Sequence, residues 1–67
     1  MEYSNSRVRE IIAENIHNQR DRDLVSRRLI DGIVMERLAE EFELSVSQVK
    51  RIVWKNSEIV FRHLEKD

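Results

Sequence analysis

The side chains with the clearest chemical potential lie between residues 45 and 55, where basic and small polar residues alternate with apolar ones. Lys50 and Arg51 are adjacent cations, and either side chain can donate hydrogen bonds to guanine O6 and N7. Ser47 can bond several bases, and Val46 can pack against a thymine methyl group. Presented on one helix, these residue types can contact the major groove of double-stranded DNA; the alternative for Lys50 and Arg51 is a role in solubility alone.

A second set of polar residues is suited to the DNA backbone. Phosphate contacts position a protein on the duplex without reading its sequence. The candidates for such contacts are Gln48, Lys55, Arg28 and Arg37. A simple role in solubility is an equally good interpretation for Arg28 and Arg37, because charged side chains usually belong to solvated faces.

These residues can work together only on a helix that begins just before them. Val49 and Ile52 are three residues apart and predict the buried stripe of that helix. Ser45 and Gln48 fit a capping box, in which each side chain bonds the backbone N–H of the other residue. We therefore expect the helix to begin after Ser45, which stands among the DNA-binding positions at its start. The side chains expected to project outward are Val46, Ser47, Lys50 and Arg51.

A shorter helix is predicted just before this one. Leu38 and Phe42 are four residues apart and share one helical face, and the small residue Ala39 suits a close helix crossing. Only residues 43–45 link the two helices, a connection so short that the helices must cross steeply, as in a helix-turn-helix. Glu43 holds a turn position that favours glycine, because the backbone there adopts positive φ.

The remaining pattern predicts an all-α domain of four helices with a helix-turn-helix and a long C-terminal recognition helix. The chain has 67 residues, no proline and a single glycine, so we expect one domain spanning 1–67. Its expected parts are an N-terminal helix in 1–17, a second helix in 18–32 capped by Asn18, a helix-turn-helix core in 34–54, and an extension of the last helix in 55–67.

Charge is distributed unevenly around the predicted turn. The net charge of the chain is only -1, whereas DNA-binding domains are usually basic. From Met35 to Leu44, however, four glutamates oppose one arginine, and from Ser45 to Asp67 five cations oppose three carboxylates. This asymmetry fits a basic recognition helix carried by an acidic scaffold.

Several function classes lack their usual sequence signals. No cysteine is present, so no disulfide or thiolate metal site is expected. His17 and His63 lack metal-ligand spacing, and no spacing indicates a catalytic set, so we expect neither enzyme activity nor a cofactor. No apolar run approaches the length of a membrane span, and no signal peptide is apparent. The expected location is the cytoplasm.

From Asn18 to about Leu64, the order of these features resembles region 4 of bacterial sigma factors, which binds the upstream promoter element. Residues 36–42 (ERLAEEF) resemble the family's "EEIAE" helix, and residues 45–50 (SVSQVK) resemble its "S-V-x-x-V-K" recognition helix. The departures are Glu43 for glycine, Val34 for a serine or threonine cap, and Arg27 for an apolar residue. The polymerase-binding segments of a complete sigma factor have no counterpart, so the resemblance implies a small stand-alone regulator of the phage or mobile-element type.

Trp54 and Phe61 leave a second function class open. They are seven residues apart and share a face that the Val49–Ile52 stripe does not need. The first helix could cover them, or they could form a homodimer seam or a docking site for RNA polymerase, a sigma factor or a phage protein. The alternative to a DNA-binding regulator is thus a protein-interaction module that docks on such a partner without reading DNA.

Overall fold

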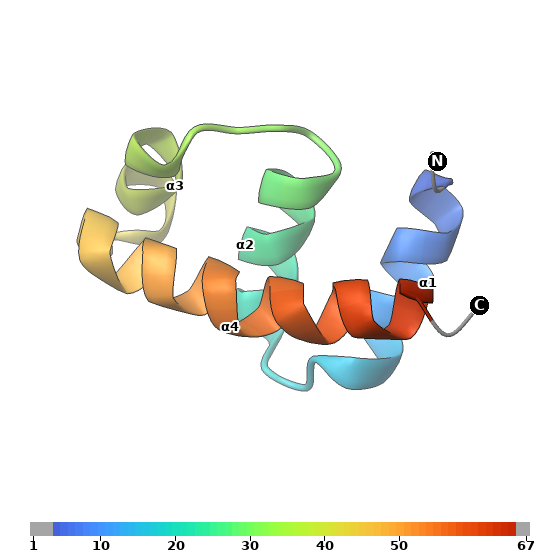
Figure 1. Ribbon diagram of the computed structural model, residues 1–67. Coiled ribbons are helices and arrows are strands. Elements are labelled where there is room, and N and C mark those ends of the chain that lie inside the picture. The colour runs from blue at the N-terminus through green and yellow to red at the C-terminus, as the bar shows by residue number, and fades with distance from the viewer. Residues whose placement is uncertain (1–3, 66–67) are drawn as a thin grey trace.

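The computed structural model describes residues 4–65, and these residues form four helices and no strand. The helices are α1 (Asn5–Asn15), α2 (Gln19–Leu29), α3 (Met35–Phe42) and α4 (Val46–Glu65). Figure 1 shows α4 running along the length of the molecule, with α3 beside its first turns, α2 across its middle and α1 near its end. The all-α, four-helix prediction is confirmed for this part of the chain. The predicted segments 1–17 and 55–67 extend at residues 1–3 and 66–67 beyond the described residues.

Local caps fix where the first two helices begin. The Ser4 hydroxyl accepts a hydrogen bond from the Arg7 backbone N–H at 3.1 Å, and the Asn18 side chain accepts one from the Asp21 N–H at 3.2 Å. Each cap satisfies a backbone donor that has no partner within the first helical turn. The predicted cap at Asn18 is confirmed.

The second helix lies within the predicted segment 18–32, and α2 ends at Leu29 with Ile30 as its C-cap, slightly before the predicted end beside Gly32. The backbone N–H of Ile33 donates to the Arg27 carbonyl at 3.2 Å, and the Arg28 guanidinium donates to the Ile33 carbonyl at 3.1 Å. Gly32 adopts a φ of 69° within this turn, a conformation that glycine reaches without steric cost. Residues 30–34 therefore form the connection that turns the chain from α2 toward α3.

Two hydrophobic clusters form the core, and α2 contributes to both. The α1 cluster consists of Ile11, Ile12, Ile16, Val25, Val60 and Leu64. The α3 cluster consists of Leu24, Leu38, Ala39, Val49 and Val53. Leu24 and Val25 are neighbours on α2 but belong to different clusters, and Ile52 packs against both. The predicted burial of Ala39 is confirmed, since only 7% of this residue is exposed.

An ion pair joins α2 to α3 on the surface. The Arg27 guanidinium donates to the Glu41 carboxylate from Nη2 at 2.8 Å and from Nε at 3.1 Å. This two-point geometry restricts both side chains more than a single contact would. The hydrogen bond and the opposite charge raise the pKa of Arg27 and lower that of Glu41. Arg27 thus connects α2 to α3 through an ion pair on the surface.

Replacing Glu41 by glutamine is expected to reduce the loss of unfolding free energy that the protein undergoes as the pH is lowered. Because Arg27 lowers the pKa of Glu41 from its ordinary value of 4.5, this carboxylate contributes stability above pH 4.5 and loses it as the pH falls through its lowered pKa. Urea unfolding between about pH 6 and pH 3 should show a smaller acid loss for Glu41→Gln than for the wild type. Glu40→Gln is the control, since Glu40 forms no ion pair among residues 4–65. Equal acid losses in the wild type and Glu41→Gln would contradict this role.

The turn between α3 and α4 has the left-handed residue expected from the sequence. Glu43 adopts φ 54° and ψ 46°, and the following N–H, that of Leu44, donates to the Ala39 carbonyl at 2.9 Å. Leu44 is half-buried and packs against the α3 cluster. The turn therefore closes α3 and directs Leu44 into the gap between α3 and α4.

Glu43→Gly is expected to be neutral or slightly stabilising in thermal unfolding. It removes a left-handed strain of roughly 1 kcal/mol, while glycine adds about 0.4–1 kcal/mol of unfolded-chain entropy. Gly32→Ala is the matched control, because a Cβ at Gly32 meets no atom within 4 Å and only its positive φ penalises it. That control should lose about 1 kcal/mol. A comparable loss in Glu43→Gly would contradict the argument.

Candidate nucleic-acid interface

The start of α4 is fixed by a reciprocal pair of hydrogen bonds. The Gln48 N–H donates to the Ser45 hydroxyl at 3.1 Å, and the Ser45 N–H donates to Gln48 Oε1 at 2.9 Å. The predicted capping box is confirmed. Because the Gln48 side chain uses its oxygen in the cap, its amide Nε2 keeps both hydrogens for another acceptor.

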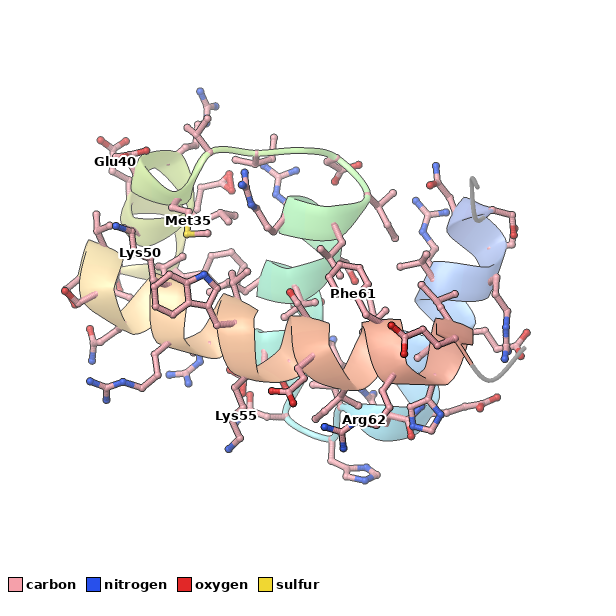
Figure 2. All side chains as sticks on the ribbon, in the orientation of Figure 1. Met35, Glu40, Lys50, Lys55, Phe61 and Arg62 are labelled. Carbon is pink, nitrogen blue, oxygen red and sulfur yellow. The ribbon has the colours of Figure 1, made fainter. Side chains whose placement is uncertain are left out.

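Three cations project from the outer face of α4. Lys50, Arg51 and Lys55 are exposed, whereas Val49, which directly precedes Lys50, is fully buried in the core. Within residues 4–65, these three side chains form no ion pair or hydrogen bond. Figure 2 shows Lys50 and Lys55 on different sides of the helix. The cations are therefore spread around the exposed arc and are available to an external anion.

Val46 differs from its prediction. Ser47, Lys50 and Arg51 are exposed as expected, but Val46 is half-buried and packs against the α3 cluster. The expectation that it projects outward is wrong, because Val46 precedes the buried residues Val49 and Val53 by three and seven positions, which places it on their face of the helix. Only part of its side chain is left to meet a thymine methyl group.

The charge asymmetry around the turn is retained in the structure. Helix α3 carries three glutamates and one arginine, whereas α4 carries four cations and two glutamates. The positive end of the α4 dipole lies at the same end of the helix as Lys50 and Arg51. Of α3 and α4, the first half of α4 is thus the part best suited to bind a polyanion.

Arg20 joins this surface although the sequence analysis did not assign it a role. It lies in the first turn of α2 and lines a hollow together with Gln48 and Arg51 and the apolar residues Leu44 and Ile52. The Arg20 guanidinium donates to the neighbouring Asp21 carboxylate at 3.2 Å. No local signal marks Arg20, because its position beside α4 follows from the packing of α2.

The other two arginines proposed for phosphate contacts lie elsewhere. Arg28 is in the last turn of α2, the end opposite Arg20, and its guanidinium bonds the Ile33 carbonyl. It serves the turn toward α3 and does not line the hollow beside α4. Arg37 is exposed on α3 and forms no ion pair within residues 4–65.

The aromatic face predicted from the sequence is solvent-exposed. Trp54 is 67% exposed and Phe61 is 50% exposed, so α1 does not cover them. Trp54 lines one depression with Ser47, Lys50 and Arg51, and it lines another with Phe61 and the charged residues Glu58, Arg62 and Glu65. The aromatic face therefore continues directly into the basic first half of α4.

The part of the chain that the structure describes offers no group of three or more metal-ligating side chains. Nor does any helix within residues 4–65 combine the length and apolar character needed to cross a membrane. Comparisons with protein family models, with curated proteins and with solved structures gave no match to this chain.

Proposed function

We propose that this chain is a DNA-binding transcription regulator in which α3 and α4 form a helix-turn-helix and α4 enters the major groove. The observation that carries the proposal is the pair of exposed cations Lys50 and Arg51, which have no ion pair within residues 4–65 and lie in the second turn of a helix whose start is fixed by the Ser45–Gln48 capping box. Recognition helices use their first turns to contact base edges. The resemblance of residues 36–50 to sigma region 4 supports the same assignment.

Each side chain of this surface has a role that follows from its chemistry. Arg51 and Lys50 donate to guanine O6 and N7, and the Ser47 hydroxyl bonds a neighbouring base edge. Gln48 donates its free amide hydrogens to a phosphate, and the N-terminus of α4 adds a favourable dipole for that anion. Arg20 and Lys55 contact phosphates on one flank, which positions α4 without reading sequence.

Few phosphates are neutralised in this arrangement, so binding should be moderate. The chain has a net charge of -1, and repulsion by its carboxylates weakens non-specific affinity for DNA. Titration of a random duplex at two salt concentrations tests the proposal. Because two cations, Arg20 and Lys55, neutralise phosphates, log K should fall with log salt at a slope of roughly −2. Absence of binding to any duplex at low salt would overturn the assignment.

A second function class is favoured by one observation, the exposure of Trp54 and Phe61 on a single face of α4. Large exposed aromatic side chains often mark protein–protein contacts. In this alternative the domain docks on RNA polymerase or a sigma factor without reading DNA. The two classes separate in the duplex titration, because the docking module has no reason to bind random DNA more tightly at low salt. Neither class assigns a catalytic site, a metal or a cofactor to the chain.

A further inference from the structure

The exposed stripe of α4 that contains Trp54 and Phe61 has opposite charges at its two ends. The aromatic residues are seven positions apart, two helical turns or about 10 Å along the axis. Lys50 precedes Trp54 by four residues, and Glu65 follows Phe61 by four residues, so all four lie near one face. Figure 2 shows Lys50 and Phe61 on one side of α4, with Lys55 and Arg62 on the other.

We propose that a second copy of this chain packs on this stripe, with the two α4 helices antiparallel. A two-fold axis that places Trp54 of one copy opposite Phe61 of the other lies midway between positions 57 and 58. The same axis places Lys50 opposite Glu65 of the other copy. One register therefore pairs both aromatic residues and both end charges. Isologous contacts of this kind are the commonest way in which identical chains associate.

Charge also selects the antiparallel over the parallel arrangement. Parallel helices would place Lys50 against Lys50 and Glu65 against Glu65, and like charges at a contact oppose association. Antiparallel helices place Glu65 near both Lys50 and Arg51 of the other copy. The residue beside the axis, Glu58, is already neutralised by an ion pair with Arg62 at 2.8 Å, so it adds little net repulsion.

This contact and DNA compete for the same residues, a consequence that rests on the proposed function. Lys50 would meet either a base edge or Glu65 of the second copy, and Trp54 lies beside Ser47 and Arg51 in the surface that would face the groove. In the dimer, α4 is therefore covered by the second copy and cannot contact DNA. Since one helix from each copy supplies the contact, its affinity should be low and its formation dependent on concentration.

Charge exchange across the axis tests the proposal without DNA. Sedimentation velocity over a concentration series measures association, and Trp54, the single tryptophan, reports its own burial through a shift of its emission to shorter wavelength. Lys50→Glu and Glu65→Lys should each weaken association about tenfold, because two symmetric pairs turn from attractive to repulsive. The double variant should recover to within about threefold of the wild type. Lys55→Glu, the same charge change off the stripe, should stay within about twofold.

Three results would overturn parts of this inference, and each is distinct. If the wild type stays monomeric at every concentration, with unchanged Trp54 emission, then it does not self-associate, and another protein would be the partner of the stripe. A double variant as weak as the single ones excludes the antiparallel register. Addition of a duplex that the wild type binds should convert the dimer into a complex of one copy with DNA. If the contact between the two α4 helices persists on DNA, then dimerisation and DNA binding do not compete. If charge exchange succeeds but no duplex binds, self-association stands and the DNA-binding proposal fails.

Discussion

Arg51→Ala is expected to weaken binding to a selected duplex by about 1–3 kcal/mol and to relax the preference at one base pair. Arg51 is exposed, has no ion pair within residues 4–65, and lies beside Arg20 and Gln48 at the hollow on the flank of α4. A guanidinium in this position can donate two hydrogen bonds to one guanine, and alanine can donate none. The measurement is a titration of wild type and variant against the selected site and against random duplex at one salt concentration.

Lys55→Ala is the matched control for that experiment. Lys55 is also an exposed cation of α4 without an ion pair among the described residues, but it lies one helical turn later. Loss of a phosphate contact should weaken binding to all sequences alike and reduce the salt slope by about one. If Arg51→Ala binds its selected site as tightly as the wild type, then Arg51 does not read DNA. The protein-docking function would then be the better assignment.

Ala39→Leu is expected to destabilise the fold by about 1–3 kcal/mol. Ala39 is buried in the α3 cluster with Leu24, Val49 and Val53, at the crossing of α3 and α4. A leucine there adds three carbon atoms to a packed space, which forces shifted side chains or a larger separation of the helices. Thermal unfolding measures the loss, which for a domain of this size corresponds to a fall in Tm of several degrees.

Ala13→Leu controls for the chemistry of the substitution. Ala13 is also in a helix, α1, but its side chain is exposed. The same three carbon atoms enter solvent there, so stability should change by less than about 0.5 kcal/mol. Equal melting curves for wild type and Ala39→Leu would mean that α3 and α4 do not approach closely at this residue.

The sequence by itself determined the features that depend on neighbours three or four residues apart. The Ser45–Gln48 capping box, the Asn18 cap and the positive φ of Glu43 were all predictable. Helical periodicity likewise predicted which side of α4 carries Val49 and which carries Lys50 and Arg51. These features are local, because a backbone donor at a helix end or a turn residue is satisfied by residues already held nearby by the chain.

Only the tertiary structure decided which residues from separate helices meet. The packing of α2 on α4 brings Arg20 to Gln48 and Arg51, and the placement of α3 beside α2 pairs Arg27 with Glu41. The same packing leaves Trp54 exposed. Such contacts depend on the angles at which helices cross and on which rows of side chains interdigitate. An apolar stripe in the sequence shows which face of a helix is buried, but it does not show which other helix covers that face.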